Sequence, residues 1–380
     1  MLAKRWQYKC LPGFSGLHGL ESPALKNDLI LENHPFIYPH SFPLECGRQL
    51  AGFQLAYSTY GTLNAAQDNV VWICHALTAN ANAAEWWEGV VGKDKLFDPE
   101  VHFIVCANVL GSCYGSTHSL STNPETGEPY YHDFPLLTIR DMVGALDLLR
   151  KHLKIERIHT CIGGSLGGQQ ALEWAIIQPG LIENLVLMAT NARHSAWGIA
   201  FNESQRLAIQ ADPTWQESRP DAGSAGLKAA RSIALLSYRN YDTYDTTQTE
   251  PEDQKIDHFR ASSYQQYQGD KLVRRFNAFA YWTLSKTMDS HHVGRGRAGI
   301  IPALQQIRSR TLVLGIGSDI LFPVEEQHFL TKHIPGATYE EIHSQYGHDG
   351  FLIEHEQITR ILTKWYASPK ETRPLVLITK

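Results

Sequence analysis

Ser165 has the sequence context that points most directly to chemistry in this 380-residue chain. It stands in residues 163–167, Gly-Gly-Ser-Leu-Gly, between an apolar run at 158–162 and a helical pattern at 169–175. A strand, the pattern G-x-S-x-G and a helix together predict a nucleophile elbow, a strained turn that holds the serine hydroxyl clear of the sheet. The glycines allow the strand and the helix to approach closely around the turn. We therefore predict that Ser165 is a nucleophile.

A serine nucleophile needs a general base, and that base needs an acid to orient it. Around such an elbow the chain order is serine, then an acid, then histidine. Asp319 comes soon after the strand-like run 311–316, and His348 lies in a Gly-His-Asp-Gly loop after the run 339–342. Taken singly, Asp319 would also suit a helix N-cap and His348 a structural role. Because both follow strands, at the edge where catalytic residues gather, we predict the triad Ser165, Asp319 and His348.

Acyl transfer at a serine also needs two backbone N–H groups that stabilise the oxyanion. One donor is the residue after the nucleophile, Leu166, and the second comes from the loop after an early strand. Residues 75–78 form that loop, and we predict Leu77 as the second donor. His75 could act as a second base, but we interpret it as a residue that shapes the loop.

The elements that must position these residues are short apolar runs alternating with helical patterns. Runs at 70–74, 103–107, 185–189 and 311–316 are typical of strands buried on both faces of a parallel sheet. The clearest helical pattern extends from Thr138 to Leu153. With the elbow, this alternation predicts an α/β-hydrolase fold, which has a mostly parallel central sheet and helices on both faces.

Residues 195–300 interrupt this alternation. They contain helical patterns at 226–238 and 272–288 and a polar stretch at 242–254 that we expect to be a loop. We interpret this segment as a helical lid inserted into a core made of residues 41–194 and 301–375. Residues 1–40 mix glycine, proline, histidine and aromatic residues without a period, and we expect an irregular N-terminal arm there.

Composition excludes several classes of function. The net charge of −5 and the lack of a basic run argue against nucleic acid as a partner. No apolar stretch reaches the roughly 20 residues of a membrane span, and the N-terminus lacks the core of a signal peptide. The six cysteines are scattered without a C-x-x-C pair, so we expect reduced thiols in a cytoplasmic protein, with no disulfide framework and no metal site.

Several short sequence motifs, between about residue 45 and about residue 365, resemble those of the homoserine O-acetyltransferase family. They stand at residues 75–78, 108–111, 163–168, 171–174, 201–203, 211–215, 267–271, 318–323 and 346–352. The chain departs from the family at one place: His118 and Ser119 stand where the family commonly has Gly-Pro. This departure leaves the acyl-donor preference open.

The resemblance implies a two-step acyl transfer. Acetyl-CoA, as co-substrate, would acylate Ser165, and the hydroxyl of L-homoserine would then take the acetyl group, giving O-acetyl-L-homoserine for methionine biosynthesis. No permanently bound cofactor and no metal are implied. The resemblance also suggests a homodimer, formed through lid helices.

The acceptor is a zwitterion, so its pocket should present one cation and one anion. Arg231 and Tyr238 are seven residues apart and share one helix face, and the resemblance implies that they hold the substrate carboxylate. Asp349, next to the base, can face the ammonium group. Without the resemblance, Arg231 would be interpreted as a solvated helix residue and Tyr238 as a core aromatic.

Alternative functions use the same triad. A carboxylesterase or thioesterase passes through the same acyl-enzyme and differs only in using water as the acceptor. The donor could instead be succinyl-CoA or the acceptor L-serine, since one methylene gives only about 1–3 kcal/mol of discrimination. A non-enzymatic scaffold would be expected to lack a triad member, and all three are present.

Overall fold

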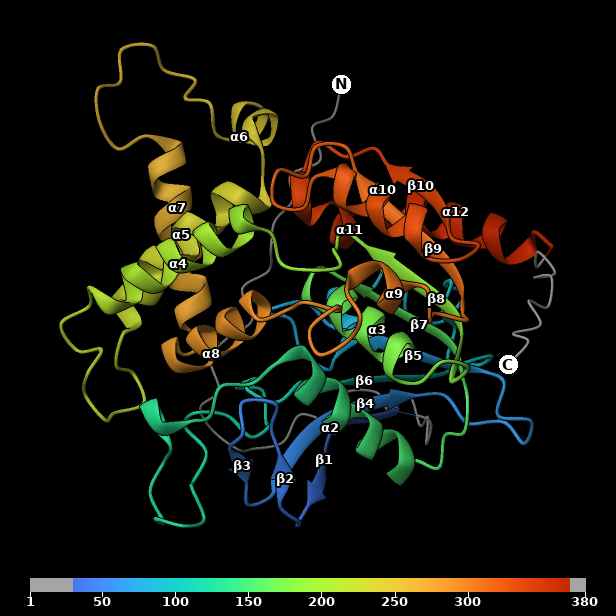
Figure 1. Ribbon diagram of the computed structural model, residues 1–380. Coiled ribbons are helices and arrows are strands. Elements are labelled where there is room, and N and C mark those ends of the chain that lie inside the picture. The colour runs from blue at the N-terminus through green and yellow to red at the C-terminus, as the bar shows by residue number, and fades with distance from the viewer. Residues whose placement is uncertain (1–29, 370–380) are drawn as a thin grey trace, which may run out of the picture.

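The computed structural model describes residues 30–369, and these residues form an eight-stranded sheet with a cluster of helices beyond one end (Figure 1). The strand order is β1-β4-β6-β5-β7-β8-β9-β10. The pairings of β4 with β1 and with β6 are antiparallel, and all others are parallel, which confirms a mostly parallel sheet. The strands are β1 (Ile30–Tyr38), β4 (Phe53–Tyr60), β5 (Val70–Cys74), β6 (Phe103–Ala107), β7 (Ile158–Gly164), β8 (Ile182–Met188), β9 (Arg310–Ile316) and β10 (Thr338–Ile342), with β2 (Phe42–Pro43) and β3 (Gln49–Leu50) as a separate pair.

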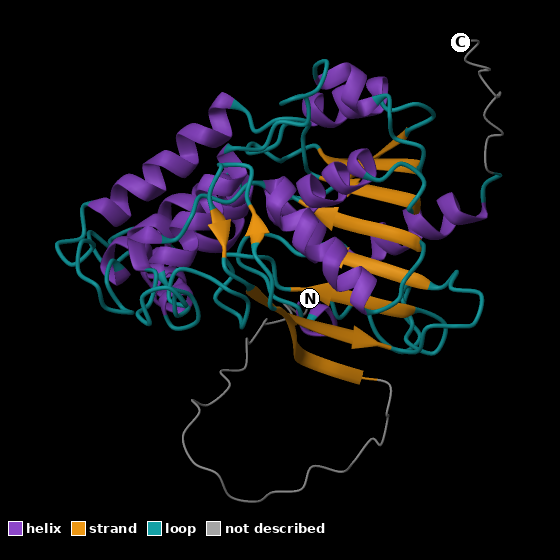
Figure 2. Cartoon of the chain, turned by 60° about the horizontal axis from the view of Figure 1, so that its bottom comes forward, coloured by secondary structure: helices purple, strands orange, loops and turns teal. Residues whose placement is uncertain are grey.

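Helices cover both faces of the sheet, as predicted, because its central strands are apolar on both sides. In β5, Trp72 belongs to a core shared with α2 (Ile139–His152) and α3 (Leu166–Ile177). Its neighbour Ile73 points to the opposite face and belongs to a core shared with α1 (Ala83–Trp86) and α12 (His355–Ala367). The strands lie side by side in Figure 2, with helices packed over them.

The core also contains three further helices and two 3-10 turns. They are α9 (Ile300–Leu304), α10 (Val324–His333), α11 (Gly350–Ile353), η1 (Tyr131–Asp133) and η2 (Gly347–Asp349). No helix within residues 30–369 is long and apolar enough to cross a membrane.

Residues 30–38 correct the prediction of an irregular arm. They form β1, which pairs antiparallel with β4 from Ile30 opposite Tyr60 to Tyr38 opposite Phe53. The strand is held by packing that the sequence does not reveal, since Phe36 is buried against Phe53, with ring centroids 6.2 Å apart. The rest of the predicted arm, residues 1–29, lies outside the described residues.

Residues 196–289, which lie between β8 and β9 in the sequence, are helical and lie beyond the ends of the parallel strands (Figures 1 and 2). We call this segment the lid. Its helices are α4 (Ala196–Gln210), α5 (Ser224–Tyr238), α6 (Tyr241–Gln248), α7 (Arg260–Val273) and α8 (Ala278–Asp289).

Two predictions within the lid are wrong, and side-chain caps explain both. The polar stretch expected to be a loop begins with α6, because the Asn240 side chain accepts a hydrogen bond from the Thr243 N–H and starts a helix. The single helix expected over 272–288 is two helices. Asn277 caps α8, because its side chain accepts a hydrogen bond from the Ala280 N–H. The backbone at the cap is extended, so α7 and α8 are separate helices.

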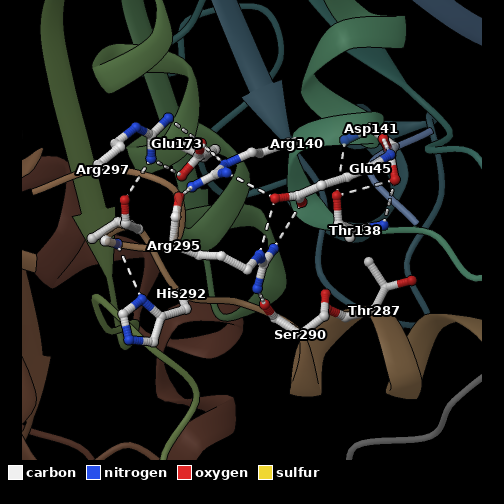
Figure 3. A network of polar contacts seen from close by, with 12 residues as sticks. Glu45, Thr138, Arg140, Asp141, Glu173, Thr287, Ser290, His292, Arg295 and Arg297 are labelled. Atoms are coloured by element: carbon white, nitrogen blue, oxygen red, sulfur yellow. Dashed lines mark hydrogen bonds and ion pairs between the residues drawn. The ribbon is translucent and has the colours of Figure 1, made fainter. Parts of the chain in front are cut away.

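A network of ion pairs attaches the segment between α8 and β9 to the core of the protein (Figure 3). The Glu173 side chain on α3 is only 2% exposed and pairs with Arg140 on α2 at 2.9 Å and with Arg297 at 2.5 Å. Glu45 pairs with Arg140 at 2.7 Å and with Arg295 at 2.8 Å. Burial raises the pKa of Glu45, but hydrogen bonds from Arg295 and Thr138 and the nearby arginine charges outweigh it and hold the pKa at about 2.

Candidate active site

Ser165 occupies the strained turn that the sequence predicts. It lies between β7 and α3 with φ of 57° and ψ of −125°, a conformation that a non-glycine residue adopts only where its surroundings impose it. A Cβ on Gly163 would lie 2.4 Å from the Gly167 backbone, and a Cβ on Gly167 would lie 2.0 Å from the Cys74 carbonyl oxygen. The glycines are therefore required by close backbone packing around the turn.

Asp319 and His348 form a direct hydrogen bond across 29 residues of sequence. The Asp319 Oδ2 atom lies 2.6 Å from His348 Nδ1, and both side chains are buried. The other oxygen of Asp319, Oδ1, accepts hydrogen bonds from the backbone N–H groups of Leu321 and Phe322 at 2.8 and 2.9 Å. Asp319 is thus not the N-cap of α10, whose cap position is Pro323. With Nδ1 donating to the carboxylate, the neutral imidazole of His348 has its lone pair on Nε2.

Aromatic rings hold the imidazole of His348 beside the elbow. The Phe322 ring stacks on it at a centroid distance of 5.0 Å, and the Phe351 ring meets it edge-on at 5.5 Å. Phe351 also lies against Gly164, where a Cβ would approach its ring to 2.6 Å. The Phe351 ring therefore contacts both His348 and the residue before Ser165. Relative exposures of 5% for Ser165, 4% for Asp319 and 3% for His348 put all three away from bulk water.

The two predicted oxyanion donors lie on neighbouring backbone segments. Leu166 is the first residue of α3, so its N–H has no partner within the helix and lies at the positive end of the helix dipole. Leu77 lies in the loop after β5. That loop packs on the start of α3, since a Cβ on Gly167 would lie 3.2 Å from the His75 carbonyl oxygen, to which Gln170 Nε2 also donates a hydrogen bond at 3.2 Å.

His75 has the contacts of a loop-shaping residue. It is fully buried, its Nδ1 lies 2.8 Å from the Ala76 carbonyl oxygen, and its Nε2 accepts a hydrogen bond from the Val109 N–H at 3.1 Å. Both ring nitrogens are used, and burial lowers the pKa of His75 to about 4. The ring therefore links the loop after β5 to the loop after β6.

Helix α5 carries Tyr238, which lies beside His348, and Arg231, which lies beside Tyr238. The Tyr238 ring lies 5.9 Å from the His348 ring, and the Arg231 guanidinium carbon lies 5.4 Å from the Tyr238 ring centroid. Burial raises the pKa of the Tyr238 hydroxyl. Arg231 and Tyr238 thus lie on the same face of α5, as their spacing in the sequence predicts.

Asp349 has a partner that the sequence alone does not reveal. Its Oδ2 forms an ion pair with Arg239 Nη1 at 2.6 Å, and both side chains are largely buried. Arg239 directly follows Tyr238, so its position next to a predicted site residue was the available signal. The ion pair occupies one oxygen of Asp349.

The residues at which the sequence departs from the family link the core to the lid. Ser119 Oγ lies 3.1 Å from Thr283 Oγ1 on α8. His118 is largely buried, and burial lowers its pKa to about 4. These hydrogen bonds connect His118 and Ser119 to the lid and to their own loop.

Comparisons with known proteins agree with this architecture. A family model described as the alpha/beta hydrolase fold matches residues 69–354. The homoserine O-acetyltransferase of Cyclobacterium marinum is 52% identical over 347 residues, which cover 91% of this chain and 98% of that protein. The crystal structure of homoserine O-acetyltransferase from Bacillus anthracis superimposes with a TM-score of 0.83 at 23% identity, over 91% of this chain and 100% of that one. Esterase E22 superimposes with a TM-score of 0.81 at 21% identity, over 89% of this chain and 100% of that one.

The sheet, the elbow and the family model define an enzyme of the α/β-hydrolase fold. The two structural likenesses show the fold alone, since an esterase and a transferase match equally well. The sequence identity is more specific because it extends over nearly the whole chain. The chain belongs to the homoserine O-acetyltransferase family, as the resemblance in its sequence predicted.

Proposed function

We propose that the protein transfers an acetyl group from acetyl-CoA to the hydroxyl of L-homoserine through an acyl-enzyme on Ser165. The observation that carries the proposal is the buried hydrogen bond of 2.6 Å between Asp319 and His348, held beside the serine elbow. This arrangement gives a serine a base and gives that base a fixed tautomer. The family relationship supplies the two substrates.

In the first half-reaction, His348 Nε2 accepts the Ser165 hydroxyl proton while Oγ attacks the thioester carbon. The oxyanion forms against the N–H groups of Leu77 and Leu166. When it collapses, the carbon–sulfur bond breaks and the coenzyme A sulfur takes the proton from His348. In the second half-reaction, His348 accepts the homoserine hydroxyl proton while the homoserine oxygen attacks the acyl carbon. The bond between that carbon and Ser165 Oγ then breaks, and Oγ takes the proton back from His348.

In this proposal, the acceptor pocket is formed by the C-terminal half of α5 and by η2. Arg231 suits the homoserine carboxylate, because a guanidinium binds a carboxylate through two parallel hydrogen bonds. Tyr238 would supply a further hydroxyl beside His348. The ion pair with Arg239 orients Asp349 and leaves Oδ1 for the substrate ammonium.

A thioesterase with the same triad is the second candidate function. The burial of the triad favours transfer, because an acyl-enzyme shielded from bulk water persists until a bound acceptor attacks it. The charged groups of the pocket have no role in simple hydrolysis.

The deciding experiment measures thiol release from acetyl-CoA and from succinyl-CoA, each with L-homoserine, L-serine or no acceptor. We expect release from acetyl-CoA that depends on L-homoserine. The Ser165→Ala variant should fold, as checked by its melting temperature, and should lose release entirely. Equal release without an acceptor would establish a thioesterase, and full activity of Ser165→Ala would refute the mechanism. Release from succinyl-CoA alone would change the donor and keep the mechanism.

We also propose that the protein acts in the cytoplasm as a homodimer. Unpaired thiols support a reducing compartment: Cys46, Cys74, Cys106, Cys113 and Cys161 are all free. Exposed Leu207 on α4 and Leu236 on α5 support an interface through the lid. Light scattering tests the dimer against a monomer mass of 42.8 kDa.

A further inference from the structure

A cavity of about 760 Å³ lies outside the proposed acyl-transfer site, between the loop after β8, α9 and the start of α10. Its lining includes Asn191, Arg193, Ile300, Pro302, Glu326 and Phe329. Its volume falls within the range of about 300–1,000 Å³ that is usual for small-molecule sites. It contains no member of the triad and none of the residues assigned to the acceptor pocket.

One wall of the cavity is apolar and open to solvent. Ile301 and Phe329 contribute to this wall and are 40% and 37% exposed, although both are large hydrophobic side chains. Ile300 and Pro302 extend the same wall. A ligand with an apolar part would remove this surface from water, which is favourable by roughly 25 cal/mol per Å².

The polar lining presents one oriented carboxyl group and one guanidinium group. Glu326 Oε2 accepts a hydrogen bond from Asn191 Nδ2 at 2.7 Å, and Asn191 is itself held by Gln169, whose Nε2 donates to Asn191 Oδ1 at 3.2 Å. The carboxylate is thus oriented before any ligand arrives. Arg193 forms no ion pair with the rest of residues 30–369, but its charge acts on Glu326.

We propose that this cavity binds a zwitterionic amino acid with an apolar side chain. Its ammonium group meets Glu326, its carboxylate meets Arg193, and its side chain packs on Ile300, Pro302 and Phe329. A simple amine would leave Arg193 without a partner, and a simple carboxylic acid would leave Glu326 without one. The proposal goes beyond acyl transfer and does not depend on it.

The ionisation of Glu326 supports the assignment of the ammonium. Burial, the largest contribution, and the charge of Asp319 raise the pKa of Glu326 to about 7, while the Asn191 hydrogen bond and Arg193 lower it. Glu325 and His292 are the other titratable groups that line the cavity. Below pH 7 most Glu326 side chains carry a proton. Because an ammonium group binds the ionised carboxylate, Glu326 must lose this proton when the ligand binds. Affinity should therefore rise about tenfold from pH 6 to pH 8.

The test is calorimetric titration of the full chain with L-leucine, L-methionine and L-phenylalanine, compared with 3-methylbutylamine and 4-methylpentanoate. The Arg231→Gln variant serves as the background, since it removes zwitterion binding at the acceptor pocket. We expect one-to-one binding of at least one of the amino acids in this background. The amine and the acid should bind at least about tenfold more weakly, because each lacks one charge-assisted contact.

Variants locate the binding. Glu326→Gln keeps an oxygen that can accept from Asn191, so it should fold and still weaken binding about tenfold or more. Arg193→Gln should do the same, and Glu340→Gln, on exposed β10, should leave affinity unchanged. Three results would overturn the proposal: no saturable binding of any of the three amino acids, binding that disappears in Arg231→Gln, or equal affinity for the amine. Binding lost only in Arg231→Gln would still support the acceptor pocket.

Discussion

At the scale of the residue, the two oxygens of Asp319 have separate tasks. Oδ1 accepts hydrogen bonds from two backbone N–H groups, which fix the carboxylate, while Oδ2 accepts the hydrogen bond from the Nδ1–H of His348. The carboxylate is therefore oriented by its own loop, and the imidazole is oriented by the carboxylate. An amide cannot perform both tasks, because one of its two terminal atoms is a donor.

We therefore expect Asp319→Asn to fold but to lose about 10⁴-fold in kcat, with a smaller effect on the KM for homoserine. If the amide NH₂ faces His348, it forces the other tautomer and removes the lone pair from Nε2. If it faces Leu321 and Phe322, it opposes two N–H donors. Steady-state thiol release measures the loss, and the melting temperature controls for folding. A loss below tenfold would show that Asp319 does not orient the base.

The predicted triad rests on chain order and strand ends, which are local signals in the sequence. Arg239 could not be predicted in the same way, because its partner Asp349 lies 110 residues away and meets it only when the lid folds over η2. His75 was interpretable because its loop directly follows a clear strand. Features that depend on neighbouring residues could thus be predicted from the sequence, and contacts between the lid and the core could not.

At the scale of the element, the lid is a helix cluster stabilised by a buried guanidinium. Arg206 on α4 is 1% exposed and pairs with Glu203 on its own helix at 2.6 Å and with Asp289 at the end of α8. It also donates to Ser285 Oγ at 3.1 Å. These contacts join the first and last helices of the lid, which are separated by about 70 residues in the sequence.

We expect Arg206→Ala to lower the free energy of unfolding by about 3–5 kcal/mol, because it leaves the Asp289 carboxylate largely buried without its cation. The matched control is Arg219→Ala, which breaks two exposed ion pairs and should cost less than about 1 kcal/mol. Urea unfolding followed by tryptophan fluorescence gives both values. Equal losses in the two variants would contradict the role of the buried pair.

The helices of the lid show which elements the sequence could define. The pattern from Thr138 to Leu153 predicted α2 closely, since Thr138 is its N-cap and Leu153 its C-cap. In the lid, hydrophobic periodicity ran through residues 272–288 without showing the break. The break is set by the Asn277 cap, which depends on one hydrogen bond. The hydrophobic periodicity of a sequence carries no information about an individual polar contact.

At the scale of the whole molecule, one glutamate connects three parts of the chain. Glu173 on α3 holds Arg140 on α2 and Arg297 in the segment between the lid and β9. The lid is inserted by two segments only, one after β8 and one before β9. The network therefore fixes one of the two connections through which the lid is held over the triad.

We expect Glu173→Gln to lower the free energy of unfolding by at least about 3 kcal/mol, because Arg140 and Arg297 lose a buried anion together. Glu100→Gln, which breaks an exposed pair with Lys93, is the control and should change it by less than about 1 kcal/mol. Thermal and urea unfolding should agree on the ranking. An unchanged midpoint for Glu173→Gln would mean that the lid is anchored elsewhere.

The two outer strands of the described sheet also bear on behaviour in concentrated solution. β1 contains Pro35, which has no N–H to donate, and its pairing with β4 shifts in register between Leu31 and His34. β10, at the opposite edge, carries the exposed charge of Glu340. A proline, an irregular register and a charge each hinder the addition of a strand from another molecule. The sheet is thus protected at both margins against growth into aggregates, even though its interior strands are almost entirely apolar.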